Sequence, residues 1–212
     1  MHIENEFEEL KPGTLLAPVP AVLVSCARPG EKPNLITLAW VGTVNSEPPM
    51  CSVSVRPERY SHPIIAETGE FIINLVGKKQ MRAADFCGVK SGRDTDKFSE
   101  CGLHALPVEG FTAPAVAECP IYLACRVVSR QLLGSHEMFI GRIERMGVKK
   151  ELMDETGRVD FARADLIAYN HGAYYGLGNA LGFFGCSVAG REVYQQRMKQ
   201  LRPDEPGKKT RK

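Results

Sequence analysis

Two arginines, Arg56 and Arg59, stand directly before a short predicted helix. Ser61 followed by Pro63 is typical of a helix N-cap with proline in the first turn, and Gly69 predicts the C-terminal stop. Free backbone N–H groups at a helix N-terminus, the helix dipole and guanidinium groups all favour an anion. The segment therefore predicts a site that holds a phosphate, with the two arginines and Ser61 as its contacts.

A strand-like run, residues 34–41, precedes this segment and mixes small with β-branched and aromatic residues. Small residues in such a strand let a planar ligand approach the backbone, whose N–H and C=O groups can then read its polar edge. We expect Thr37, Ala39 and Trp40 to line that ligand. The alternative for Trp40, which is compatible with the first, is a plain core anchor.

A second strand-like run, residues 49–55, carries Ser52 and Ser54 and leads into Arg56. These three residues alternate and therefore share one face of the strand. A row of polar side chains that ends in arginine favours a face that binds a ligand. A strand with a solvated outer face would show the same alternation without any ligand.

A third apolar run, residues 70–75, contains Asn74. A buried asparagine needs a hydrogen-bond partner, which a cofactor hydroxyl or ring edge would supply. His62 has no carboxylate at a telling spacing, so it is interpreted as a surface histidine and not as a general acid.

The remaining pattern is that of short strands with few helices. A strand is predicted over residues 17–28, and a long hairpin over 119–147 turns at 134–136. A short helix is predicted over 78–86 and a helical turn over 95–99. Strands and helices do not alternate, which favours a closed β-barrel over a doubly wound parallel sheet.

Charge is distributed unevenly along the 212 residues, whose formal net charge is +2. Residues 191–212 carry eight Lys/Arg against three Asp/Glu, which leaves −3 for the rest of the chain. We predict an N-terminal arm (1–14), one domain (15–190) and a basic tail without ordered structure (191–212). The tail is interpreted as solvated, so no nucleic-acid partner is expected.

The seven cysteines contain no C-x-x-C pair, so no metal site is predicted and the thiols are expected to be reduced, in the cytoplasm. The N-terminus is acidic where a signal peptide would be basic and then apolar. No run approaches the roughly 20 apolar residues of a membrane helix, so no membrane partner is expected.

Several of these segments, in this order, resemble the flavin reductase-like, FMN-binding split-barrel family, in its flavoredoxin and ferric-reductase branch. They are N-L-I-T-L-A-W (34–40), P-P-M-C-S-V-S-V-R (48–56), R-Y-S-H (59–62), G-E-F-I-I-N-L (69–75), S-G-R-D-T-D-K-F (91–98) and Y-Y-G-L-G (174–178). The resemblance covers roughly residues 15 to 187, most of the chain.

The resemblance implies a mainly β fold, an FMN-binding split β-barrel with a few short helices that forms a homodimer, with FMN near the subunit interface. It implies an oxidoreductase that passes electrons from NAD(P)H to flavin or ferric chelates, in which FMN carries the chemistry and the protein needs no dedicated catalytic acid or base. The implied cofactor-binding residues are Thr37, Leu38, Ala39, Trp40, Ser52, Val53, Ser54, Val55, Arg56, Ser61, Asn74, Lys90, Ser91, Asp96, Lys97 and Phe98. Composition alone would make the segment 90–98 a solvated charged loop.

Two alternatives to this function remain open. The first is a flavoredoxin-like electron carrier that holds FMN tightly and receives electrons from a redox protein. The second is another use of a split-barrel pocket, such as pyridoxamine-phosphate oxidation or haem binding. The absorption spectrum separates these cofactors.

Overall fold

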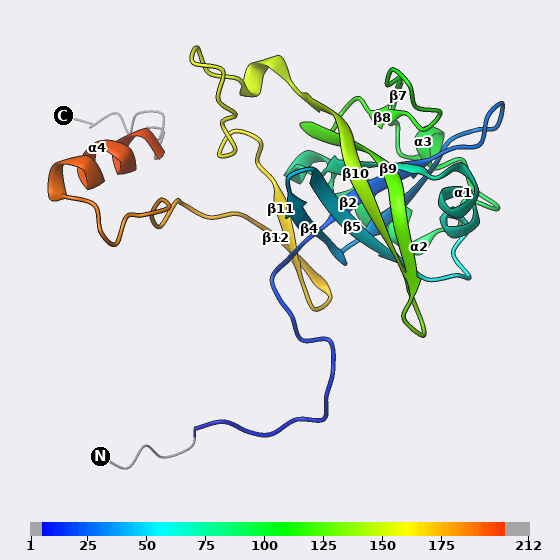
Figure 1. Ribbon diagram of the computed structural model, residues 1–212, viewed down its shortest axis with the longest axis horizontal. Coiled ribbons are helices and arrows are strands. Elements are labelled where there is room, and N and C mark those ends of the chain that lie inside the picture. Colours follow the sequence, from blue (N-terminus) through cyan, green and yellow to red (C-terminus); the bar gives the residue numbers. More distant parts are fainter. Residues whose placement is uncertain (1–5, 202–212) are drawn as a thin grey trace, which may run out of the picture.

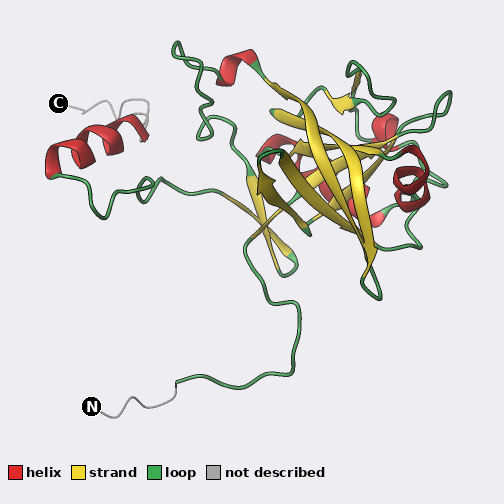
Figure 2. Ribbon diagram, in the orientation of Figure 1, coloured by secondary structure: helices red, strands yellow, loops and turns green. Residues whose placement is uncertain are grey.

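The computed structural model describes residues 6–201 and is dominated by one seven-stranded antiparallel sheet (Figure 1). The strand order is β3-β2-β6-β9-β10-β5-β4. The strands are β2 (Val22–Cys26), β3 (Asn34–Leu38), β4 (Val41–Ser46), β5 (Pro49–Val55), β6 (Glu70–Leu75), β9 (Ile121–Leu132) and β10 (Glu137–Val148). The sheet curls into a barrel (Figure 2). Its two edge strands, β3 and β4, are consecutive in the chain, so the seam of the barrel lies between them.

Side chains alternate between the two faces of each strand, and those on the inner face fill the barrel. In β5, Cys51, Val53 and Val55 are buried in the main apolar cluster, whereas Ser52 and Ser54 point to the other face. Fully burying an apolar side chain of this size contributes about 1.5–3 kcal/mol, which fixes the register of β5 against its neighbours.

Smaller elements surround the barrel. Short strands are β1 (Val19–Pro20), β7 (Ala105–Leu106), β8 (Ala115–Val116), β11 (Ile167–Asn170) and β12 (Ala173–Gly176). Helices are α1 (Ser61–Thr68), α2 (Met81–Val89), α3 (Lys97–Glu100) and α4 (Arg191–Leu201), with single 3-10 turns η1 (Lys78–Gln80) and η2 (Lys150–Leu152). No helix within the described residues is long and apolar enough to cross a bilayer.

The strand predicted over residues 34–41 is in fact divided. Strand β3 ends at Leu38, and Ala39 and Trp40 turn the chain into β4, a strand that the sequence pattern did not predict. The backbone N–H of Ser54 donates to the carbonyl oxygen of Trp40 at 3.0 Å and holds this corner against β5. The seam of the barrel therefore lies at Trp40.

The strand predicted over residues 17–28 is also divided. Val19 and Pro20 pair with β11, whereas Val22 begins β2 in the main sheet. Proline has no N–H to donate to a ladder, so Pro20 suits the short edge pairing of β1 and not the central strand β2.

Two helix ends differ from the prediction. Ser61 is the first residue of α1 and not its cap: the N-cap position is Tyr60, and no side chain caps the helix. Gly69 ends the helix in the left-handed conformation, with φ of 66°, as predicted. The helix predicted from residue 78, ending near Gly88, is the 3-10 turn η1 followed by α2, which begins at Met81 and ends at Val89.

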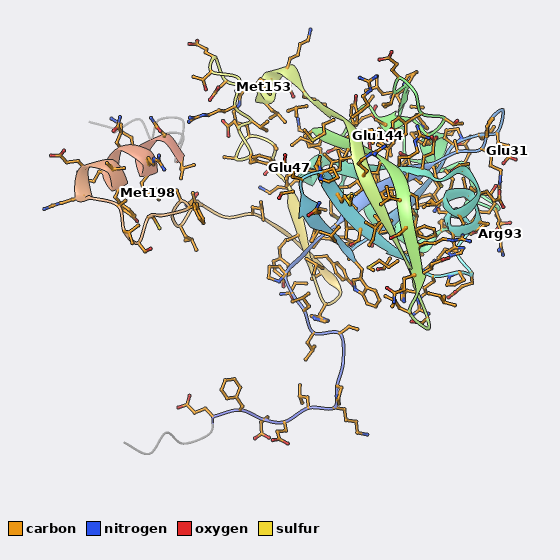
Figure 3. All side chains as sticks on the ribbon, in the orientation of Figure 1. Glu31, Glu47, Arg93, Glu144, Met153 and Met198 are labelled. Atoms are coloured by element: carbon orange, nitrogen blue, oxygen red, sulfur yellow. The ribbon has the colours of Figure 1, made fainter. Side chains whose placement is uncertain are left out.

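The prediction of a tail without ordered structure is wrong for residues 191–201, which form α4; residues 202–212 lie outside the described part of the chain. Helix α4 lies apart from the barrel, with Met198 on it (Figure 3). The ring of Phe183 packs against that of Tyr194, with centroids 5.9 Å apart. The guanidinium group of Arg197 lies 5.1 Å from the centroid of the Phe183 ring. These local contacts, which charge counting does not anticipate, order the helix.

Candidate functional site

A cavity of about 400 Å³ opens between the start of β3, the start of α1 and the segment that joins α2 to α3. We call it the cationic cavity; its lining residues are Asn34, Ile36, Arg56, Glu58, Arg59, Tyr60, Ser61, Cys87, Lys90, Ser91, Gly92 and Lys97. A second cavity, of about 160 Å³, is the Trp40 cavity, lined by Ile36, Thr37, Leu38, Ala39, Trp40, Ser54, Arg56, Arg59 and His136. Ile36, Arg56 and Arg59 line both, so the two cavities form one elongated site.

Lys97 is the most unusual residue of the cationic cavity, because its side chain is buried, with 4% exposed. Its Nζ donates to the carbonyl oxygens of Leu35 (2.7 Å) and Cys87 (2.8 Å). Burial lowers the pKa of Lys97 from its usual 10.5. Within residues 6–201 no carboxylate lies within 4.0 Å of this ammonium group, so a buried charge lines the cavity without a protein counter-ion.

Three further cations line the same cavity and are exposed: Arg56, Arg59 and Lys90. Arg56 lies 3.5 Å from the carboxylate of Glu58, an exposed pair that offsets part of this charge. The positive charge still exceeds the negative, so the cavity is suited to an anionic group.

Ser61 is held at the cavity by Asn34, whose Nδ2 donates to its Oγ at 2.7 Å. Both residues are buried. Gly92 packs so closely here that a Cβ would lie 2.0 Å from Asn34 Oδ1 and 2.8 Å from Tyr60 Cδ1. A glycine is therefore required at residue 92 if Asn34 is to orient Ser61.

Cys87 also lines the cationic cavity, but burial raises its pKa to about 12. A thiol with that pKa stays protonated at neutral pH, so it acts here as a packing group and not as a nucleophile.

The Trp40 cavity has an aromatic wall, formed by two rings whose planes are tilted by 41°. Trp40 is 45% exposed, and its ring centroid lies 4.4 Å from that of His136. Burial, followed by the charge of Arg56, lowers the pKa of His136, which favours the neutral imidazole. Trp40 is thus an exposed ring at the seam of the barrel, and the core-anchor alternative is wrong.

The structure brings together ten of the sixteen residues proposed from the sequence. Those that line one or both cavities are Thr37, Leu38, Ala39, Trp40, Ser54, Arg56, Ser61, Lys90, Ser91 and Lys97. Thr37 also donates its hydroxyl to the carbonyl oxygen of Ala84, which ties β3 to α2.

The other six residues line neither cavity, and they lie in the core, in a helix cap or elsewhere on the strands. Val53 and Val55 are in the barrel core, Phe98 packs in a second core cluster, and Ser52 lies further along β5. Asp96 accepts from the backbone N–H of Ser99 as the cap of α3 and pairs with Lys32 at 3.0 Å.

Asn74 is the sixth residue, and its polar atoms are bonded inside the protein. Its Nδ2 donates to the carbonyl oxygen of Leu23 (3.1 Å), and its Oδ1 accepts from the N–H of Val116 (2.8 Å). These strands meet its hydrogen-bonding requirement without a cofactor.

The set of proposed cofactor-binding residues omits several cavity residues: Asn34, Ile36, Glu58, Arg59, Tyr60, Cys87, Gly92 and His136. Arg59 is nevertheless one of the two arginines predicted as phosphate contacts, and its position in the cationic cavity agrees with that prediction. The S-G-R motif contains Gly92 but gave no reason to place it in the site. His136 gave no signal, because its contact with Trp40 joins residues far apart in the sequence.

The interpretation of His62 as a surface histidine is wrong. Its side chain is 14% exposed, and Nε2 lies 2.6 Å from Oε2 of Glu137, a carboxylate distant in sequence and supplied by β10.

The combined site suits an elongated ligand with an anionic end and a flat end. Cations and Ser61 surround the first end, and Trp40 and His136 flank the second. Within the described residues no cluster of three His, Cys, Asp or Glu side chains could hold a metal ion.

Comparison with known proteins agrees with this geometry. The family model described as "Flavin reductase like domain" matches residues 15–189. The chain is similar to the solved flavoredoxin of Desulfovibrio vulgaris (Miyazaki F), with 31% identity and a TM-score of 0.78 over 84% of this chain and 96% of that one. It is also similar to a flavoredoxin from Methanosarcina acetivorans, with 29% identity and a TM-score of 0.76 over 86% and 100% of the two chains.

A curated relative from Rhodococcus opacus is the reductase component of 4-nitrophenol 4-monooxygenase/4-nitrocatechol 2-monooxygenase. It is 28% identical over 121 residues, which are 57% of this chain and 61% of that protein. Several curated relatives are matched over between 48% and 66% of their own length. The family match covers most of the chain, includes both cavities, and agrees with the split-barrel fold. This protein therefore belongs to the flavin reductase-like, FMN-binding split-barrel family, whose members are flavin-related oxidoreductases and electron-transfer proteins.

Proposed function

We propose that this chain binds one FMN, with the phosphate in the cationic cavity and the ring in the Trp40 cavity. The observation that carries the proposal is Lys97, a buried cation that has no protein carboxylate near it among the described residues and lines a cavity with two arginines. A phosphate supplies the missing negative charge. FMN is preferred over FAD because the site has one phosphate-sized cluster of cations.

The residues of the chain then have separable roles. Lys97 and Arg56 attract the phosphate, and Ser61, oriented by Asn34, donates a hydrogen bond to it. The exposed Trp40 ring, with His136 tilted against it, forms an aromatic wall on which the flavin ring packs. Bound FMN supplies hydride and single-electron transfer.

The reaction that we propose is NAD(P)H-dependent reduction of flavin or ferric chelates. The reductase component from Rhodococcus opacus supports a reductase role by similarity. The alternative is a flavoredoxin-like electron carrier with tightly held FMN and a redox protein as donor, which the likeness to two flavoredoxins supports. The cytoplasmic location stays a prediction.

The absorption spectrum of the purified protein, recorded before and after anaerobic addition of NADH or NADPH, tests these proposals. A flavin spectrum that bleaches with the nicotinamide supports the reductase. Flavin that survives purification but does not respond to either nicotinamide supports the carrier. A haem or pyridoxal spectrum, or failure of the apo-protein to take up FMN, would overturn the FMN proposal. Equal or tighter binding of FAD in a titration would overturn the preference for FMN.

We also propose a homodimer. The described segments 6–16 and 177–201 extend away from the barrel (Figure 1), and both carry exposed apolar side chains. Leu16 is 85% exposed, Leu181 93% and Phe184 fully. A third cavity, of about 330 Å³, lies between the N-terminal arm, β11 and Trp40, so it adjoins the proposed ring position. A second copy that covers this face would remove apolar surface from water and complete the enclosure of the ring.

A further inference from the structure

Glu137 contacts both ends of the segment 56–61, which lines the cationic cavity. At the first end, Val55 pairs with Glu137 across the β5–β10 ladder, directly before the segment begins. At the second end, the carboxylate of Glu137 lies 2.6 Å from His62, directly after the segment enters α1. One residue of β10 therefore closes the segment into a loop.

The His62–Glu137 contact is shielded from water, since each side chain is only 14% exposed. The ring of His62 meets the buried Phe139 edge-on, with centroids 5.4 Å apart and planes at 64°. The second carboxylate oxygen of Glu137 lies 3.5 Å from Arg130, which is half exposed. A hydrogen bond in such surroundings constrains geometry more than one on the open surface does.

The residue before Glu137 is His136, whose ring packs on Trp40 in the other cavity. A displacement of the start of β10 therefore moves His136 and the segment 56–61 together. The start of β10 therefore contacts both ends of the elongated site: His136 contacts Trp40, and Glu137 contacts the segment 56–61 at its two ends.

We propose that His62 and Glu137 are positioning residues: they hold the segment 56–61 in its anion-binding form and couple its occupancy to the Trp40–His136 ring pair. The identity of the anion rests on the proposed function, whereas the coupling rests on the geometry above. Occupation of the cationic cavity then changes the surroundings of Trp40 through Glu137.

The test uses His62→Gln and, separately, Glu137→Gln, so that one variant remains if the other does not fold. Inorganic phosphate, FMN and riboflavin, which lacks the phosphate, are titrated while emission from Trp40, the single tryptophan, is recorded. The His104→Gln variant is the matched control: His104 lies 2.6 Å from the carboxylate of Glu118, the same distance, but lines neither cavity. Arg130→Gln controls for loss of the second contact of Glu137.

We expect each test variant to bind phosphate and FMN roughly tenfold more weakly, the factor for one lost charge-assisted hydrogen bond. Riboflavin affinity should change less, and the response of Trp40 emission to phosphate should be lost. Both controls should behave as the wild-type protein.

Wild-type phosphate affinity and an intact Trp40 response in both folded variants would overturn the coupling while leaving the FMN proposal standing. An equal loss of affinity for riboflavin and FMN would show a general structural role and would also overturn it. If the wild-type protein binds phosphate but not FMN, the proposed function fails, and the phosphate titration still decides the coupling.

Discussion

The ammonium group of Lys97 lies 2.7 Å from the carbonyl oxygen of Leu35, the second residue of strand β3. The same group reaches the Cys87 carbonyl oxygen at the end of α2. One lysine from α3 thereby joins three elements and brings a positive charge to the wall of the cationic cavity. Dipoles of two carbonyl groups compensate a buried charge only in part, so an anion should bind with a large electrostatic gain.

Replacement of Lys97 by Met should weaken FMN binding by roughly 1.5–3 kcal/mol, the range for a charge-assisted contact. The uncharged side chain removes a desolvated cation, so the apo-protein should lose little stability. Isothermal titration with FMN measures the first effect, and thermal unfolding measures the second. Lys79→Met, at an exposed lysine that lines neither cavity, is the control and should leave binding unchanged.

The lowered pKa of Lys97 predicts a pH dependence in the alkaline range. Between its pKa in the folded protein and the ordinary value of 10.5, the unfolded chain binds more protons at this residue than the folded protein does. Lys97 therefore makes the apo-protein more stable as the pH rises through this window, while FMN affinity falls as the ammonium loses its proton. The difference in melting temperature between wild type and Lys97→Met, followed from neutral pH to 10.5, isolates this residue from other titrating groups. A difference that does not vary with pH would contradict the prediction.

Gly92→Ala should weaken FMN binding even though residue 92 supplies no side chain. The added Cβ would meet Asn34 Oδ1 at 2.0 Å, so Asn34 must move and Ser61 loses the bond that orients it. We expect a loss of roughly 1–3 kcal/mol in affinity, the range for a disturbed hydrogen bond. The control is Gly42→Ala, where the Cβ meets nothing within 4 Å. Equal affinities of the two variants would show that the contact of Gly92 with Asn34 does not matter for binding.

Arg56→Ala should reduce FMN affinity by roughly 1.5–3 kcal/mol if one charge-assisted phosphate contact is lost. Arg56 lines both cavities, so the loss should be larger than that for Arg93→Ala, at an exposed arginine on the periphery of the molecule (Figure 3). Fluorescence titration of FMN measures both. An unchanged dissociation constant for Arg56→Ala would remove that residue from the site.

Deletion of residues 191–212 removes α4 and should weaken the proposed dimer, because an isolated helix of this length is marginal and gains stability by packing on another surface. Deletion of residues 203–212 alone should leave the fold and flavin binding intact, since that stretch has no large apolar residue. Sedimentation over a dilution series, with and without FMN, measures the assembly. Added FMN should tighten the dimer if the partner helps to enclose the ring. A holo-protein that remains monomeric at micromolar concentration with full flavin occupancy would rule out a shared pocket.

The sequence by itself determined those strands, helix ends and turns that depend only on residues close together in the chain. The runs 49–55 and 70–75 form strands with the predicted bounds, Gly69 ends α1, and residues 134–136 lie in the hairpin turn. Period-two alternation and a glycine with positive φ act within a few residues, so they can be read along the chain. The order of the motifs was also sufficient to identify the family.

Tertiary structure decided which polar residues face the ligand. Asn74 and Asp96 looked like cofactor contacts but satisfy strands and a helix cap, whereas His136 and Asn34 reach the cavities. His62 contacts the carboxylate of Glu137 on β10, which is distant from it in the sequence. A buried polar atom accepts any partner with suitable geometry, and sheet pairing chooses that partner by bringing distant residues together. The residue types alone therefore predicted an anion site, and the curl of the sheet determined which side chains form it.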